Sequence, residues 1–180
     1  MPCSAGHFFI CKMVTITTAR LIIRPFTLDD ALFIIELLNT KGWLRFIGNR
    51  NVYTNEDAVN YLLNGPMKSY AENGFGLSCI CIKESGEPIG MSGLIKRPQL
   101  QFPDIGFALL PSFEKKGYAY EAASGIIADA RNRYDFEKLA AITNTDNELS
   151  GNLLKKLGFV FENEIEMDNE ILNLYELKLK

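Results

Sequence analysis

The stretch Glu114-Lys115-Lys116-Gly117-Tyr118-Ala119-Tyr120 joins a strand-like run at residues 104–110 to a helix-like run at residues 119–133. A loop in this place presents several backbone N–H groups at the start of a helix, where the first turn lacks intrahelical partners. Helix starts of this kind bind anions. The stretch therefore suits a phosphorylated ligand, and the function of the chain depends on whether this loop holds a pyrophosphate.

The composition limits the class of protein. The chain has 180 residues, 47% of them hydrophobic, and a chain of this size can bury roughly 70% of its unfolded surface in one core. A net charge of -3 gives no general attraction to nucleic acid, and no basic stripe extends beyond pairs such as Lys115-Lys116 and Lys155-Lys156. No apolar run approaches the roughly 18 residues that span a bilayer. We therefore expect a cytoplasmic protein with neither a nucleic-acid nor a membrane partner.

Cysteine and histidine are sparse, which argues against metal and hydrolase chemistry. The cysteines at positions 3, 11, 79 and 81 do not have zinc-ligand spacing, so we expect reduced thiols and no metal site. The only histidine, His7, lies in residues 1–12, an extended start or a disordered leader before a single domain at 13–180. A histidine-based triad is therefore not expected, and a general base must be a carboxylate, a tyrosine, a lysine or a water relay.

Hydrophobic periodicity predicts the element order β-α-α-β-β-β-α-β-α-β-β. The expected strands are 19–24, 75–82, 88–95, 104–110, 138–143, 160–166 and 171–178. Helices are expected after the N-caps Thr27 and Thr54, with Gly65-Pro66 interrupting or kinking the second, and again at 119–133 and 147–157. A hairpin followed by a strand-helix-strand crossover favours an α/β fold with a mixed sheet covered by helices.

Several motifs, in order, resemble the GNAT superfamily of acyl-CoA-dependent N-acetyltransferases. They are Ile105-Gly106-Phe107 with Pro111, Lys116-Gly117-Tyr118-Ala119-Tyr120-Glu121-Ala122, Asn147-Glu148-Leu149-Ser150 and Lys156-Leu157-Gly158-Phe159. The opening Thr18-Ala19-Arg20-Leu21-Ile22-Ile23-Arg24-Pro25-Phe26 resembles the Rim-type branch, which includes enzymes that acetylate ribosomal-protein N-termini. The resemblance covers residues 14–180 and implies a mostly antiparallel mixed sheet flanked by about four helices.

The resemblance also implies acetyl-CoA as the acyl donor. In this family the pyrophosphate lies on the loop amides, here Lys115, Lys116, Gly117, Tyr118 and Ala119. The pantetheine arm pairs with the backbone of the preceding strand, here Phe107, Ala108, Leu109 and Leu110. Gly117 permits a close approach of ligand to backbone, and the two lysines can add charged contacts to phosphate. Glu114 departs from the family pattern, because an acidic side chain beside phosphates is unfavourable unless it points elsewhere.

Candidate catalytic residues follow from the same resemblance. Asp104 matches the place where family members often carry a catalytic carboxylate, and the alternative is an ordinary acid at the start of a strand. Weaker candidates for the base are Glu162, Glu166 and Glu170. The tyrosine that many members use to protonate the departing thiolate is replaced by Leu154.

In the Rim branch the proposed substitute for this tyrosine is a serine early in the same helix, and Ser150 matches it. The resemblance thus implies that Ser150 also contacts the cofactor. The alternative for Ser150 is a role in the first helical turn alone. Asn147 is expected to cap this helix and to bond the pantetheine or a nearby water. A backbone amide in residues 108–110 is the expected donor to the carbonyl oxygen.

The acceptor is the least defined partner. Aromatic candidates for the wall of its pocket are Trp43, Phe46 and Tyr53, with Ile47 beside them and Tyr175 opposite, although an aromatic cluster can equally be core. An α-amino group loses only about 1 kcal/mol by deprotonation at pH 7, against about 4.6 for lysine, so a peptide N-terminus or small amine is favoured. We expect direct transfer in a ternary complex by a monomer or homodimer; the alternative is a non-catalytic acyl-CoA sensor.

Overall fold

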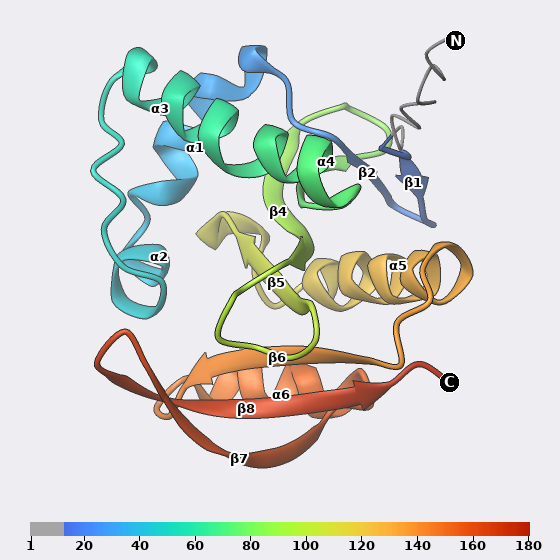
Figure 1. Cartoon of the computed structure of the whole chain (residues 1–180). Helices are drawn as coiled ribbons and strands as arrows, with labels where there is room; N and C mark the ends of the chain where they lie inside the picture. Colours follow the sequence, from blue (N-terminus) through green and yellow to red (C-terminus); the bar gives the residue numbers. More distant parts are fainter. Residues whose placement is uncertain (1–12) are drawn as a thin grey trace, which may run out of the picture.

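The computed structural model describes residues 13–180, so His7, Cys3, Cys11 and the predicted leader lie outside the described residues (Figure 1). The strands are β1 Ile16–Thr17, β2 Leu21–Arg24, β3 Leu77–Ile82, β4 Pro88–Ile95, β5 Asp104–Leu109, β6 Lys138–Asn144, β7 Val160–Met167 and β8 Glu170–Lys178. The helices are α1 Ala31–Leu38, α2 Lys41–Phe46, α3 Asn55–Leu62, α4 Lys68–Asn73, α5 Tyr118–Arg133 and α6 Glu148–Lys156. Short 3-10 turns, η1 Leu28–Asp30 and η3 Pro111–Phe113, and the π-helical turn η2 Leu63–Met67 complete the list.

All eight strands belong to one sheet, in the order β1-β2-β3-β4-β5-β6-β8-β7. Every neighbouring pair is antiparallel except β5 and β6, which are parallel because α5 crosses over between them. The predicted mixed, mostly antiparallel sheet is therefore confirmed. In Figure 1 the group β6, β8 and β7 lies below β5, with α6 behind it.

Two apolar cores cover opposite faces of the sheet. On one face Ile34 of α1 and Leu62 of α3 pack with Met91 of β4. On the other face Ile126 of α5 and Leu154 of α6 pack with sheet residues. Side chains alternate along β5, so Ala108 contacts the first core whereas Phe107 and Leu109 contact the second.

Most local signals have the structural effect predicted from sequence. The Thr54 hydroxyl accepts a hydrogen bond from the Asp57 N–H at 3.1 Å, and the Asp57 carboxylate accepts from the Thr54 N–H at 2.9 Å, which starts α3. Gly65-Pro66 does not end this helix. The chain passes through the π-helical turn η2 and continues as α4, which ends where Gly74 adopts a φ of 75°.

The two-residue strand β1 and one helix were not predicted. The connection expected after residue 39 contains α2, whose N-cap Thr40 accepts from the Trp43 N–H at 3.3 Å. A helix of six residues has no clear periodic pattern, and its position depends on the Trp43 side chain, which is buried in the first core.

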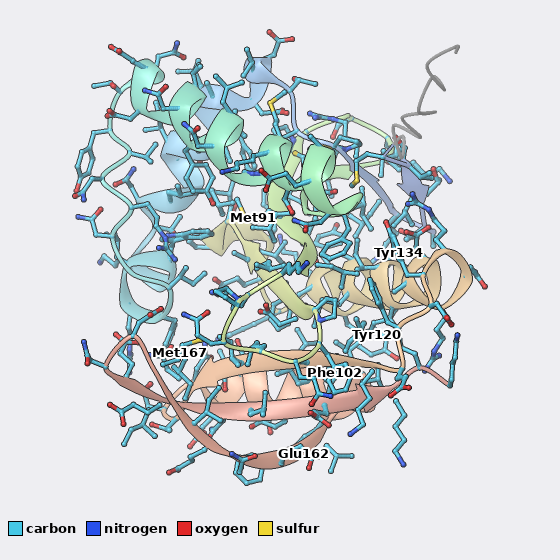
Figure 2. All side chains as sticks on the ribbon, viewed as in Figure 1. Met91, Phe102, Tyr120, Tyr134, Glu162 and Met167 are labelled. Atoms are coloured by element: carbon cyan, nitrogen blue, oxygen red, sulfur yellow. The ribbon has the colours of Figure 1, made fainter. Side chains whose placement is uncertain are left out.

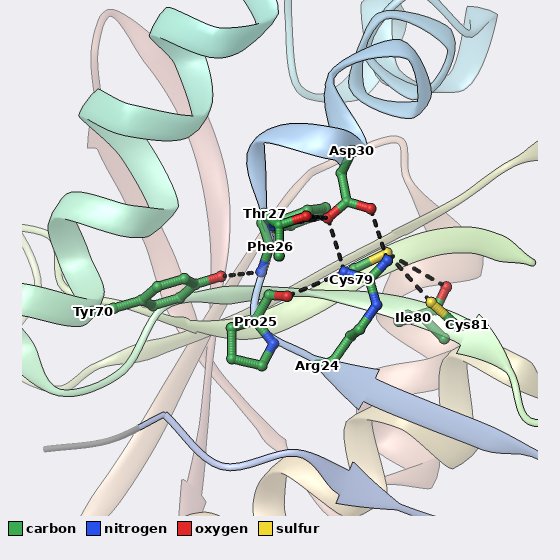
Figure 3. A network of polar contacts seen from close by, with 9 residues as sticks. All are labelled: Arg24, Pro25, Phe26, Thr27, Asp30, Tyr70, Cys79, Ile80 and Cys81. Atoms are coloured by element: carbon green, nitrogen blue, oxygen red, sulfur yellow. Dashed lines mark hydrogen bonds and ion pairs between the residues drawn. The ribbon is translucent and has the colours of Figure 1, made fainter. Parts of the chain in front are cut away.

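A polar network fixes the start of α1 against the sheet (Figure 3). The Arg24 guanidinium in β2 donates to both carboxylate oxygens of Asp30 at 2.8 and 2.7 Å, and the Thr27 N–H donates to the same carboxylate at 2.9 Å. Cys79 and Cys81 beside it are buried free thiols with sulfur atoms 3.6 Å apart, as expected for reduced cysteines. The network therefore ties the helices that precede the sheet hairpin to β2.

Two further properties of residues 13–180 bear on the predicted partners. None of the helices in this range is long and apolar enough to cross a membrane. The same residues contain no cluster of three or more His, Cys, Asp or Glu side chains that could hold a metal ion.

Candidate active site

The sheet opens between β5 and β6. Within the described residues these parallel strands share one register pair, Asp104 with Ala140, supported by a hydrogen bond from the Ala140 N–H to the Pro103 carbonyl at 2.9 Å. By contrast, β5 pairs with β4 over the whole range from Asp104 to Leu109. The carboxyl-terminal part of β5 therefore has a backbone edge that β6 does not pair with. Such an edge can pair with an extended ligand.

This edge leads to the start of α5. Gly117 is the N-cap, with a φ of 83°, and no side chain accepts hydrogen bonds from the first turn of this 16-residue helix. Lys115 also has a positive φ, 59°, so the loop turns sharply just before the helix. The first N–H groups of α5 are available to an anion, as the sequence predicts. The structure thus brings together the loop residues 115–119 and the strand residues 107–110.

Arg20 in the loop before β2 holds this turn in place. Its Nη1 donates to the Lys116 carbonyl at 3.1 Å, and its Nε donates to the Glu121 carboxylate at 2.7 Å. The Thr18 hydroxyl and the Arg20 N–H also donate to Glu121, each at 2.7 Å. Although partial burial alone raises the pKa of Glu121, these hydrogen bonds keep it below its usual range. Sequence reasoning did not assign this role to Arg20, because its partners are about a hundred residues away.

A hollow of about 550 Å³ lies on the outer face of the same helix end. Its lining residues are Thr18, Arg20, Gly117, Tyr120, Glu121, Ser124, Gly125 and Lys156. The Lys156 ammonium of α6 lies 4.7 Å from the centre of the Tyr120 ring, which Figure 2 labels. An aromatic ring and cations beside a helix start without a side-chain cap suit the nucleotide end of a phosphorylated ligand.

The Glu114 side chain points away from the proposed phosphate site, so it does not place a negative charge beside the phosphates. Its carboxylate lies beside α2, because a Cβ built on Gly42 would stand 3.9 Å from Glu114 Oε1. The acidic side chain therefore extends to α2, a helix that the sequence did not predict.

Asp104 lies where β5 and β6 begin to diverge. Asp104 is only 2% exposed, and its carboxylate accepts a hydrogen bond from Arg97 Nε at 3.0 Å. Burial raises the pKa of the Asp104 carboxyl to about 6, although Arg97 counteracts this rise. Because Asp104 shares a face of β5 with Ala108, it faces the side of the sheet that carries α1 and α3. A carboxylate with this pKa is ionised at neutral pH and can accept a proton. The other candidate bases, Glu162 (labelled in Figure 2), Glu166 and Glu170, are exposed on β7 and at the start of β8.

The start of α6 lies at the carboxyl end of β6. The Asn147 side chain accepts from the Ser150 N–H at 3.2 Å, so Asn147 caps α6 as predicted. Ser150 is half-buried in the first turn. Leu154 is 1% exposed and belongs to the core between α6 and the sheet. The position of the family tyrosine is thus filled by a packing residue.

The aromatic candidates for the acceptor pocket are not brought together. Trp43 is 5% exposed in the first core, and its indole Nε1 has no hydrogen-bond partner among residues 13–180. Phe46 is half-buried, and Tyr53 is exposed, with its hydroxyl accepting from Asn49 at 2.6 Å. Tyr175 lies in the second core, where its ring meets Phe161 edge-on and a Cβ on Gly151 would clash with its hydroxyl. Trp43 and Tyr175 therefore pack on opposite faces of the sheet.

Comparison with known proteins identifies the family. Residues 20–160 match the family described as the acetyltransferase (GNAT) domain. The chain belongs to this family. As a GNAT protein it is an N-acetyltransferase, and members of the family use acetyl-CoA. The resemblance stated from the sequence motifs is confirmed.

Individual GNAT relatives agree with this assignment. The chain is 27% identical over 144 residues to a Bacillus subtilis protein described as the uncharacterized N-acetyltransferase YoaA, covering 79% of this chain and 80% of that protein. An acetyltransferase structure from Agrobacterium tumefaciens aligns with a TM-score of 0.79 at 22% identity, covering 92% of this chain and 95% of that chain. RimL, a ribosomal L7/L12 α-N-protein acetyltransferase solved with coenzyme A, aligns with a TM-score of 0.78 at 17% identity, covering 92% and 98%. At these identities the two structures show a shared fold.

Proposed function

We propose that the protein transfers an acetyl group from acetyl-CoA to a primary amine, by direct attack in a ternary complex. The observation that carries the proposal is the continuity between the unpaired edge of β5 and the uncapped start of α5. An extended arm that ends in a pyrophosphate needs a free strand edge followed by free N–H groups. We also propose that residues 13–180 act as one domain in the cytoplasm.

The chain's own residues fit each part of the donor. The N–H groups that follow Gly117 would hold the pyrophosphate, with Lys115 and Lys116 adding charge. Backbone groups of residues 107–110 would pair with the pantetheine arm, and Asn147 would contact it from α6. The hollow lined by Tyr120 and Lys156 would take the adenosine end. Acetyl-CoA supplies a thioester, and all the binding groups come from the protein.

The transfer forms a C–N bond and breaks a C–S bond. Asp104 would accept the proton that the amine releases, either directly or through a water, because its carboxylate is ionised above a pKa of about 6. A backbone N–H in residues 108–110 would donate to the carbonyl oxygen, on which negative charge develops. Ser150 would donate a proton or a hydrogen bond to the departing sulfur. Cys79 and Cys81 are assigned no covalent role, since both are buried on β3.

A protein N-terminus is one candidate for the acceptor, and a small-molecule amine is the other. RimL and a Vibrio fischeri ribosomal-protein-S5-alanine acetyltransferase, which aligns with a TM-score of 0.77 at 21% identity, act on proteins according to their descriptions. This supports a peptide acceptor without deciding between the two, because the likeness concerns the fold. A monomer or a homodimer is compatible with the site, all of whose proposed residues lie in one chain.

The first test is binding of the donor. At a free concentration ten times its dissociation constant, acetyl-CoA would raise the free energy of unfolding by about 1.4 kcal/mol, which a thermal-shift or denaturant experiment can measure. Gly117→Ala is expected to weaken this binding, because its φ of 83° is unfavourable for a residue with a Cβ and the loop would reorganise. Gly86→Ala is the matched control, since Gly86 has a φ of 75° in the β3–β4 turn and open space around it.

The second test is turnover. A panel of amines and N-terminal peptides, followed by detection of free CoA thiol, should give transfer with at least one acceptor. Binding of acetyl-CoA without thiol release from any acceptor would instead support a sensor domain. Equal weakening by Gly117→Ala and Gly86→Ala would contradict the proposed role of the loop.

A further inference from the structure

The helix α2 touches both loops that leave the diverging strands. At its start, Gly42 stands beside the carboxylate of Glu114, which precedes the proposed CoA loop. Near its end, Arg45 Nη2 donates to Asp146 Oδ2 at 2.9 Å, and Asp146 directly precedes Asn147, the cap of α6. The short helix therefore reaches from the end of β5 to the end of β6. It lies across the open end of the gap in which acetyl transfer is proposed.

The orientation of α2 is fixed by its buried face. Trp43 is anchored in the first core, whereas positions 42, 45 and 46 share another face of the helix. That face presents the Arg45 guanidinium, which lies 4.8 Å from the centre of the Phe46 ring. α2 contains two cations, Lys41 and Arg45, and no acidic residue. α2 itself therefore brings only positive charge to the rim, where Glu114 and Asp146 are its acidic neighbours.

The ion pair at this rim is held loosely. The side chain of Arg45 is 66% exposed and that of Asp146 is 61% exposed. Exposed pairs of this kind contribute little to stability, because water solvates both charges almost as well as they solvate each other. Asp146 can therefore be replaced on Arg45 by another carboxylate at small cost. The pair itself shows that the guanidinium can hold a carboxylate at this position.

We propose that Arg45 selects acceptors that carry a carboxylate near the amine, and that Asp146 occupies the same position until the acceptor binds. The proposal rests on the proposed acetyltransferase function and names the class of its acceptor. A free amino acid and a peptide with an acidic residue next to its N-terminus both have this chemistry. No covalent change is involved.

The experiment compares two matched pairs of acceptors by thiol release at saturating acetyl-CoA. One pair is a free α-amino acid and its amide; the other is a peptide with Glu or Gln at its second position. The carboxylate member is expected to have a KM about tenfold lower, the effect of one charge-assisted hydrogen bond, with kcat little changed. A preference confined to one pair identifies whether the source is a free amino acid or a peptide.

Variants separate selection from a structural ion pair. Arg45→Ala is expected to remove the preference, and Arg45→Lys to restore part of it. Asp146→Asn is expected to lower the KM of the carboxylate acceptors further, because the competing carboxylate is gone. A merely structural pair predicts that Arg45→Ala and Asp146→Asn change KM in the same direction.

Lys68→Ala is the matched control, because it breaks the exposed Lys68–Glu72 pair in α4, with side chains 58% and 60% exposed, and should leave the preference unchanged. Thermal melts and acetyl-CoA binding confirm that each variant is folded. This inference alone would be overturned if the wild type turned over acid and amide acceptors with equal KM. It would also be overturned if Arg45→Ala and Asp146→Asn changed KM in the same direction. Absence of thiol release from every acceptor would overturn the proposed function and this inference with it.

Discussion

Replacing Asp104 by asparagine is expected to lower activity and, at neutral pH, to raise stability. The carboxyl has a pKa of about 6 in the folded protein because of burial, against about 3.9 in an unfolded chain. Its pKa is thus raised on folding, so the carboxyl contributes most to stability below about pH 4, and this contribution is lost as the pH rises through about 6. Above that pH, the ionised side chain costs the folded state about 3 kcal/mol.

The asparagine variant avoids this cost and keeps a similar shape. Its amide oxygen can still accept from Arg97 Nε, which is 3.0 Å from the carboxylate in the wild type. For a chain of 180 residues, a gain of about 3 kcal/mol corresponds to a rise in Tm of roughly 6–12 °C. At the same time kcat/KM should fall by roughly 100-fold or more, if Asp104 is the general base.

Thermal melts of wild type and Asp104→Asn at pH 8 and pH 4 measure the first effect, and thiol release across the same range measures the second. The Tm difference should be large at pH 8 and nearly absent at pH 4. The wild-type kcat/KM should rise with pH through about 6, following the Asp104 pKa. If Asp104→Asn were less stable than the wild type at pH 8, or if the Tm difference did not depend on pH, the pKa assigned to Asp104 would be refuted. Unchanged turnover in Asp104→Asn would refute the role of Asp104 as base.

Three further substitutions test separate parts of the site. Ser150→Ala should lower kcat at least about tenfold, because it removes a proton donor. It should leave the Kd for acetyl-CoA unchanged, because the Asn147 cap is not altered. Steady-state kinetics measure kcat, and isothermal titration measures the Kd. Arg20→Ala should raise the Kd of acetyl-CoA and leave kcat at saturation unchanged, because it releases the Lys116 carbonyl and the loop. Leu154→Tyr should destabilise the protein by about 1–3 kcal/mol in urea titrations without raising turnover, because the position is 1% exposed and closely packed.

The parts of the fold that were predicted correctly are those with local signals. Thr54 with Asp57 forms a capping box, and Gly158, with a φ of 94°, follows α6, as their residue types suggest. The strand, loop and helix around Gly117 likewise follow from a short stretch of sequence. Such elements depend on hydrogen bonds within a few residues, so the amino-acid types alone indicate where they begin and end.

The environment of Asp104 could not be predicted in the same way. Its carboxylate pairs with Arg97 in the connection between β4 and β5, and its burial depends on the side of the sheet covered by α1 and α3. The resemblance to the GNAT family gave Asp104 as a candidate base. Only the packing around it raises the pKa of its carboxyl to about 6, which brings the group into the range in which a base is useful.

The acceptor side shows why a list of aromatic residues is a weak guide to a pocket. Trp43 and Tyr175 belong to different cores because α2 packs on one face of the sheet and α6 on the other, and alternation along a strand decides which face a side chain meets. Sequence distance carries no information about that choice. The proposed rim of the gap rests instead on the Arg45–Asp146 ion pair and on the Glu114 carboxylate beside Gly42, which join residues far apart in the chain. In this fold the proposed donor site is built mainly from one continuous stretch, whereas the proposed acceptor rim forms only when α2 meets the loops after β5 and β6. Residues that select the acceptor can therefore change without disturbing the residues that bind the donor.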